Sequence, residues 1–245
     1  MRRALSLAAP AFNEAASLQT VLELWLQQLS ALPQIESFEI VICNDGSRDR
    51  TGEILDELAR HHPQLRPVHL PQNRGAAVAM RTAIRNTTLP WVLILDSDGQ
   101  YGLDNLPAML AALDLQPADG VHGVRRKKHA PAAARFGSWL SGKLCNLLLG
   151  APYQDFNCTF NLLRGELARE LPLEAKGLNY STDILAKLGE ARARLLHLPI
   201  HQGDRLGGAS SMKLLRDASH RALFVGYLTV RRLLLDLGVL ERQRL

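Results

Sequence analysis

Two acidic residues separated by a single position offer the clearest chemistry in this chain. Asp96 and Asp98 directly follow the apolar run 91–95 (WVLIL). Two carboxylates this close repel each other unless a cation lies between them, and Mg²⁺ or Mn²⁺ takes such oxygen ligands and shares them with substrate phosphates. The pattern indicates a divalent-metal site. A helix cap at Asp96 followed by a turn at Asp98 is the alternative.

Other polar clusters also follow or precede apolar segments. They are Pro10–Glu14 (PAFNE), Asn44–Ser47 (NDGS) and Asn73–Gly75 (NRG). The Asn44 amide could hydrogen-bond a nucleobase, whereas Asp45 and Ser47 suit turn and N-cap chemistry. The third cluster is either a plain helix start or a place where backbone N–H groups bind an anion. Because ligands of open α/β sheets bind at the carboxyl ends of strands, we expect the clusters to meet at one edge.

The segments between these clusters alternate between strand-like and helix-like patterns. Strands are expected at 5–9, 38–43, 66–70, 91–95, 158–163 and 194–198, and helices at 14–32, 50–62, 75–86, 131–149, 181–188 and 212–237. Near-continuous apolar strands between helices predict a mostly parallel, doubly wound α/β sheet with both faces covered. We expect one domain over 1–211, containing a glycine-rich loop at 203–211, and a C-terminal amphipathic helical extension over 212–245.

Composition restricts the class of protein. The 245 residues are 47% hydrophobic and 22% charged, which is typical of a globular fold. A net charge of +5 suits an anionic substrate or membrane surface, but the basic runs are too sparse for nucleic-acid binding. Three scattered cysteines favour a reducing compartment, and no run nears the roughly 20 apolar residues that span a bilayer. We therefore expect a cytoplasmic protein, soluble or peripheral on the cytoplasmic membrane face.

Taken together, the motifs have a family likeness. The ordered set P-x-F-N-E, N-D-G-S, N-R-G, L-D-S-D-G-Q, G-V-R-R and R-L-G-G-A-S resembles the family 2 glycosyltransferases of GT-A fold. The likeness is strongest to the branch of dolichyl-phosphate mannose synthases and bacterial polyprenyl-phosphate glycosyltransferases. It extends over about residues 5–213. Each motif is weak alone, but their order and spacing together are specific.

The resemblance implies an inverting, metal-dependent transfer of a sugar from a nucleotide-sugar donor, with a UDP- or GDP-sugar as the donor. The implied donor-binding residues are Pro10, Phe12, Glu14, Asn44, Asp45, Arg74, Gly75, Asp96 and Ser97. The implied ligands of Mg²⁺ or Mn²⁺ are Asp96, Asp98 and Gln100. The implied catalytic residues are Asp98, Asp183 and Arg205, the last in a loop that could close over the donor and exclude water. Phe12 replaces the family's usual tyrosine, and Asn44 stands where many members carry aspartate.

An acceptor phosphate requires cations. The implied set is Arg125, Arg135, Ser138 and Ser210, with Arg125 opening the basic run 125–129. Asn161 stands where the family usually has a basic residue. The expected acceptor is a lipid phosphate, which is already anionic and needs no strong base. A glycan or small-molecule hydroxyl is the alternative acceptor, and Asp183 would then be the general base.

Two further alternatives stay open from the sequence. Asn44 and Asn161 would also fit a nucleotide-sugar-binding protein that has lost catalysis. At the C-terminus, leucines interleaved with arginines over 212–237 fit an interfacial helix beside anionic lipid, a helix packed on the core, or a dimer contact.

Overall fold

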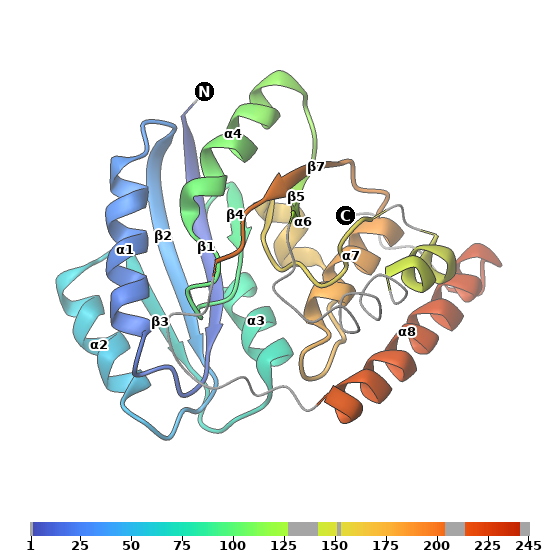
Figure 1. The fold of residues 1–245 in the computed structure, drawn as a ribbon, viewed down its shortest axis with the longest axis horizontal. Helices are drawn as coiled ribbons and strands as arrows, with labels where there is room; N and C mark the ends of the chain where they lie inside the picture. Colours follow the sequence, from blue (N-terminus) through green and yellow to red (C-terminus); the bar gives the residue numbers. More distant parts are fainter. Residues whose placement is uncertain (1, 127–141, 151–152, 204–213, 241–245) are drawn as a thin grey trace.

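The core of the protein is one seven-stranded sheet (Figure 1). The computed structural model describes residues 2–126, 142–150, 153–203 and 214–240. The strands, in the order β3-β2-β1-β4-β6-β5-β7 across the sheet, are β1 (Arg3–Ala11), β2 (Ile35–Asn44), β3 (Leu65–His69), β4 (Trp91–Ile94), β5 (Gly120–Arg125), β6 (Asn161–Arg164) and β7 (Leu195–Ile200). Only β6 runs antiparallel to its neighbours. The predicted mostly parallel α/β sheet is therefore confirmed.

Helices cover both faces of the sheet. They are α1 (Leu18–Ala31), α2 (Thr51–His61), α3 (Ala76–Arg85), α4 (Leu106–Leu115) after the short turn η1 (Leu103–Asn105), α6 (Gly165–Glu170), α7 (Tyr180–Glu190) and α8 (Leu214–Asp236), with a further helix over residues 142–149. Side chains alternate along a strand, so β1 directs Leu5 and Leu7 into the core beneath α1, α2 and α4, and Ala8 into the core beneath α3, α6, α7 and α8. This two-sided burial explains the near-continuous apolar strands.

Several expected boundaries change in the structure. The strand expected at 158–163 begins only at Asn161, because its side-chain amide donates to the carbonyls of Cys158 and Thr159 and holds them in a turn. The helices α4 and α6 were not expected. The expected helix at 131–149 and the expected loop at 203–211 lie largely outside the described residues.

The C-terminal segment forms a single long helix. α8 packs Val225 and Leu228 into the same core cluster as Ile184 of α7, and Figure 1 shows α8 along the edge of the molecule beyond α7. No helix among the described residues is long and apolar enough to cross a bilayer.

A buried carboxylate fixes the start of β4. The Ser6 hydroxyl (2.6 Å), the Thr88 N–H (2.5 Å) and the Thr88 hydroxyl (3.0 Å) donate to Glu39 Oε1, and the Arg66 guanidinium pairs with Oε2. The Leu89 N–H donates to the Ser6 hydroxyl at 3.1 Å. Burial alone would raise the pKa of Glu39, but these hydrogen bonds outweigh it and lower the pKa. The network joins β1, β2 and β3 to the turn that leads into β4 and Asp96.

Replacing Glu39 with glutamine should lower the free energy of unfolding at pH 7 by about 2 kcal/mol, because a charge-assisted acceptor becomes partly a donor facing other donors. The native pKa lies below the ordinary value of 4.5, so this contribution is present at neutral pH and disappears as the pH falls from that value through the lower native pKa. Urea unfolding at pH 7 and at acidic pH measures both effects. Glu36→Gln, at an exposed position on the same strand, is the matched control; equal losses in the two variants would contradict the network.

Candidate active site

The loops after β1 and β2 are tied together at the carboxyl edge of the sheet. Ala11 pairs with Asn44 at the ends of these strands. Beyond them, the Asn13 N–H donates to Ser47 Oγ at 3.0 Å, and Asn13 Oδ1 accepts from the Arg48 N–H at 2.9 Å. Asn13 has φ +55°, a conformation that asparagine tolerates better than most residues. The two loops therefore form one joined wall.

The residues expected to line a nucleoside pocket lie on or beside this wall. Pro10 is the half-buried next-to-last residue of β1, and its carbonyl accepts a hydrogen bond from Ser97 Oγ at 2.6 Å, which links the β1 edge to the turn after β4. Phe12 is 40% exposed, an unusual exposure for a large apolar residue. The Glu14 N–H donates to Thr51 Oγ1 at 2.9 Å.

Asn44 is engaged at both ends of its amide. Its Oδ1 accepts from the Ser47 N–H at 3.0 Å, which leaves Nδ2 to donate to His69 Nδ1 at 3.0 Å. His69 is then the neutral tautomer that carries its proton on Nε2, and this nitrogen faces Asp56 Oδ1 at 3.1 Å. The contact of Asn44 with a nucleobase stays a prediction.

Asp45 ties the turn after β2 to the loop between β3 and α3. This side chain is 1% exposed, and its carboxylate accepts the backbone N–H groups of Arg74 (2.7 Å) and Gly75 (2.9 Å). The backbone N–H groups of the Asn73–Gly75 cluster, which the sequence left available to an anion, thus donate hydrogen bonds to Asp45. Gly46 has φ +62°, and a Cβ there would lie 2.4 Å from the carbonyl carbon of Gln72, so only glycine fits.

The paired acids of the turn after β4 have different surroundings. Asp98 is 5% exposed, and its Oδ1 accepts the Gln100 N–H at 3.1 Å. Asp96 Oδ2 accepts from Thr159 Oγ1 at 2.8 Å, and Oδ1 accepts from the Tyr180 hydroxyl. Burial first, and then the charges of Asp96 and Asp98, raise the pKa of Tyr180 well above its ordinary value. The phenol therefore stays protonated and serves as a donor.

The donor set at this turn fits a hard divalent cation that also binds substrate. Among the described residues, no group of three or more His, Cys, Asp or Glu side chains could hold a metal. Asp96, Asp98 and the Gln100 amide could supply oxygen ligands, since a carboxylate has lone pairs beyond those used by hydroxyl donors. Mg²⁺ and Mn²⁺ commonly complete such partial sets with phosphate oxygens and water.

A buried ion pair lies beside the acids. Arg125, at the end of β5, binds Asp155 through two bonds, Nε to Oδ2 at 2.6 Å and Nη2 to Oδ1 at 2.8 Å. Burial alone would lower the pKa of Arg125, but Asp155 raises it, so the guanidinium is always charged. Burial raises the pKa of Tyr101, and the charges of both Arg125 and Asp96 act on its hydroxyl. The charges of Arg125 and Asp96 therefore act on the same buried phenol in opposite directions.

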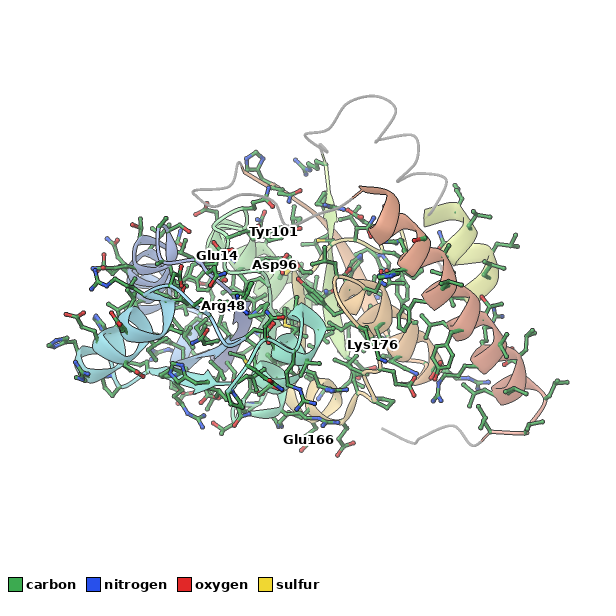
Figure 2. The ribbon with its side chains drawn as sticks, turned by 90° about the horizontal axis from the view of Figure 1, so that it is seen from below. Glu14, Arg48, Asp96, Tyr101, Glu166 and Lys176 are labelled. Atoms are coloured by element: carbon green, nitrogen blue, oxygen red, sulfur yellow. The ribbon has the colours of Figure 1, made fainter. Side chains whose placement is uncertain are left out.

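Figure 2 shows Glu14, Asp96 and Tyr101 grouped over the middle of the molecule, whereas Glu166 on α6 lies apart from them. The structure thus brings the β1 loop and the turn after β4 to one side, as the sequence predicted for strand ends. Of the remaining expected residues, Arg135, Ser138, Arg205 and Ser210 lie outside the described residues.

Asn161 has an internal role in the structure. The side chain is fully buried, and its Oδ1 lies 2.7 Å from His122 Nδ1. Its amide nitrogen donates to backbone carbonyls, so Oδ1 is the acceptor and His122 donates from Nδ1. Burial lowers the pKa of His122 to about 4, which keeps the ring neutral. Asn161, which stands where the family usually has a basic residue, thus holds the neutral His122 ring in the core.

Asp183 is held inside the protein at the first turn of α7. It is fully buried, and its Oδ2 accepts the N–H groups of Glu174 (2.6 Å) and Ala175 (2.7 Å). Its Oδ1 is buried and has no hydrogen-bond partner among the described residues. Burial raises the pKa of this carboxyl to about 6. Its role as a base stays a prediction.

Comparison with known proteins decides the family. Residues 6–171, about two thirds of the chain, match the profile of glycosyl transferase family 2. The chain belongs to this family.

Relatives in the glycosyl transferase family 2 include lipid-phosphate enzymes. The chain is 28% identical over 208 residues to an undecaprenyl-phosphate 4-deoxy-4-formamido-L-arabinose transferase of Shewanella sediminis, covering 84% of this chain and 61% of the relative. It is 26% identical over 171 residues to a dodecaprenyl-phosphate galacturonate synthase of Rhizobium johnstonii, covering 69% and 50%. The chain thus spans between half and about three fifths of the length of these relatives.

The fold matches that of solved GT-A glycosyltransferases. Glucosyl-3-phosphoglycerate synthase from Mycobacterium tuberculosis, solved with Mn²⁺, uridine diphosphate and phosphoglyceric acid, superposes with a TM-score of 0.67 at 20% identity, covering 94% of this chain and 78% of that one. At this identity the likeness establishes the fold, including the sheet and its flanking helices.

Sequence reasoning missed three residues that contact the candidate site. Tyr180 and Thr159 orient Asp96, and Asp155 orients Arg125. Asp155 and Thr159 shortly precede Asn161, a position that the resemblance compares with the family, so a signal existed. Tyr180 stands one turn before Asp183 on α7, where helical spacing alone could have placed it on the same face.

Asp183→Asn should change the pH dependence of stability in a defined direction. The unfolded carboxyl ionises near its ordinary pKa of 3.8 and the native one near 6, so ionisation favours the unfolded state between these values. Relative to wild type, the asparagine variant should gain on the order of 2–3 kcal/mol in unfolding free energy between pH 4 and pH 7. Urea unfolding of both proteins across this range gives the difference; a constant difference would disprove the raised pKa.

Proposed function

We propose that this chain transfers a sugar from a nucleoside diphosphate sugar to a polyprenyl phosphate, with inversion, at a site that uses Mg²⁺ or Mn²⁺. The observation that carries the proposal is the short segment 155–159, which contacts both an acid and a cation. Thr159 Oγ1 donates to Asp96 Oδ2 at 2.8 Å, and Asp155 accepts both bonds from Arg125. An enzyme that joins two phosphate-bearing substrates needs a metal site and a cation held in one framework.

The donor would lie along the joined wall of the β1 and β2 loops. Phe12 offers an exposed ring to the base, and Asn44 and Asp45 order the neighbouring turn. Asp98 and Asp96 would hold the divalent cation, with Gln100 beside them. When bound, this cation neutralises the charge that develops on the departing diphosphate. In this proposal, the contacts that Asn44 makes with the nucleobase determine whether the donor is a UDP- or a GDP-sugar.

The residues beside the acids set the geometry of the reaction. Tyr180 and Thr159 donate to the two oxygens of Asp96 and fix its rotamer before substrate arrives. This preorganisation avoids a cost at the moment of reaction. Thr159 precedes β6 and Tyr180 opens α7. Segments that would lie near the acceptor thus align Asp96, which would hold the metal beside the donor.

On the acceptor side, Arg125 would bind the phosphate. Its two bonds to Asp155 hold the guanidinium plane in place, and its Nη1 lies 3.5 Å from Gln202 Oε1 at the outer side. A phosphate oxygen attacks the anomeric carbon, the bond from that carbon to the diphosphate breaks, and the nucleoside diphosphate leaves. The attacking oxygen is already anionic, so no base is required. The full burial of Asp183 agrees with this requirement.

The names of the relatives support the same acceptor class, since two of them carry undecaprenyl or dodecaprenyl phosphate. The synthase solved with Mn²⁺ and uridine diphosphate supports the metal and the donor. In this proposal the protein acts at the cytoplasmic face of the membrane, where nucleotide sugars are made. It reaches its lipid acceptor from the membrane surface.

A hydroxyl acceptor is the second candidate, and one observation favours it. Asp183 Oδ1 has no hydrogen-bond partner among the described residues, and the pKa of about 6 is suited to a general base. Under this alternative, Asp183→Asn reduces kcat by a factor of roughly 100 or more with KM unchanged. Under the phosphate proposal, the same variant retains most of its kcat.

Asp98→Asn should remove metal-dependent donor binding, because a neutral amide is a far weaker ligand for a hard cation. We expect kcat/KM to fall roughly 100-fold or more. We also expect the rise in melting temperature produced by UDP or GDP with Mn²⁺ to disappear. Thermal-shift and radiolabelled-sugar transfer assays measure the two effects.

Asp104→Asn is the matched control, since Asp104 is exposed and lies six positions further along the chain. It should retain both the metal-dependent shift and turnover. A variant Asp98→Asn that keeps wild-type turnover, with Mn²⁺ still raising the melting temperature in the presence of nucleotide, would refute the proposed metal site.

A further inference from the structure

Exposed apolar residues concentrate on one side of the molecule. Thirteen large apolar side chains are exposed among the described residues, and nine of them belong to the helix over 142–149 or to residues 223–239 of α8 and the turn after it. We refer to these nine as the apolar patch. Leu147, Leu223 and Leu237 are 76%, 74% and 75% exposed. A concentration of this kind on a folded protein marks an interaction surface.

Within the patch, the residues of α8 form a continuous face of that helix. Leu223, Tyr227, Val230 and Leu237 recur at helical spacing and are exposed, whereas Leu228 on the opposite side is 1% exposed in the core. α8 is therefore apolar on two faces, of which the fold buries only one.

The helix over 142–149 extends the patch sideways. The Arg232 guanidinium donates to the Leu148 carbonyl at 3.1 Å, so the two helices are in contact, and both figures show them side by side. Beneath this contact lies a cavity of about 390 Å³, lined by apolar residues such as Leu149 and Leu235 and by charged ones such as Glu190 and Arg192. The two helices therefore enclose a cavity of mixed polarity behind the patch.

Basic side chains border the patch. Lys143 and Arg192 are exposed, and neither has an acidic partner among the described residues. Arg231 is paired with Glu190 at 3.2 Å, and Arg232 faces Asp236 at 3.4 Å. The border of the patch therefore carries an excess of positive charge.

We propose that the apolar patch is a membrane-docking surface that inserts into the interface of an anionic bilayer. Leucines, a valine and a tyrosine beside basic residues match the acyl boundary and the anionic headgroups respectively. The proposal deepens the proposed function, because it states how a chain that acts on a lipid phosphate reaches the membrane. The docking proposal rests on the proposed function for its biological purpose. Its physical evidence, the exposed apolar residues and the basic border, is independent of that function.

A second copy of the chain fits the patch less well. In a twofold dimer each patch would face its own equivalent, so the basic borders would oppose like charges. An anionic surface instead complements both the apolar centre and the basic border. Charge complementarity therefore selects the bilayer.

Flotation of the purified chain with lipid vesicles tests the proposal. We expect binding to phosphatidylcholine vesicles that contain phosphatidylglycerol, weaker binding without it, and loss of binding at high salt. Leu223→Ser combined with Leu233→Ser should lower the partition coefficient roughly tenfold or more. Lys143→Gln should lower it about fivefold.

Matched controls separate the patch from general surface effects. Leu24→Ser combined with Leu115→Ser removes two exposed leucines from α1 and α4, and Arg85→Gln removes an exposed charge from α3. Both controls should bind as wild type does. The proposal is overturned if wild type does not float with anionic vesicles, if the double serine variant at 223 and 233 floats equally well, or if light scattering shows a dimer that this variant dissociates.

These vesicles contain neither donor nor acceptor, so their result is independent of catalysis. Transfer to a short, water-soluble prenyl phosphate is measured in parallel without vesicles, and the patch variants should retain wild-type turnover there. Vesicle binding without transfer would refute the proposed acceptor but leave the docking surface standing. Transfer without vesicle binding would do the reverse.

Discussion

The carboxylate of Asp96 joins the two halves of this structure. It follows β4 at the centre of the sheet, and it accepts hydrogen bonds from Thr159 before β6 and from Tyr180 at the start of α7. On its other side, the Ser97 hydroxyl anchors the same turn to the β1 edge. The end of β1, the residues before β6 and the start of α7 are thus held against one turn. The orientation of the acid pair therefore depends on tertiary contacts, and the local D-x-D sequence alone would leave it loose.

Charge is compensated wherever the fold buries it. Asp45 is surrounded by backbone donors, Arg125 is matched by Asp155, and Glu39 is satisfied by neighbours from three segments. Unpaired buried charges are costly, so such pairing is expected in a stable domain. Asp183 is the exception, since one of its oxygens lacks a partner among the described residues. Its raised pKa is the physical consequence, because neutralisation by a proton relieves the cost.

The sequence predicted the parts of the site that depend on short-range spacing. Asp96 and Asp98 follow a buried strand, and parallel strands must end at the same edge, so their convergence with the β1 and β2 loops was predictable. The direction of β6 was not, because an apolar run has the same pattern in either orientation. The backbone donors of Arg74 and Gly75 looked available to a ligand, yet Asp45, almost thirty residues away, accepts them. Helical periodicity likewise identified α8 as amphipathic but could not show that two of its faces are apolar.

The reversed direction of β6 has an evolutionary consequence. β5 ends and β6 begins at the same edge of the sheet, so the connection over residues 126–160 starts and finishes at that edge. Insertions or deletions far from its two ends would leave every strand register intact. Selection can therefore lengthen or trim this one connection beside Asp96 without disturbing the sheet that positions the acid pair.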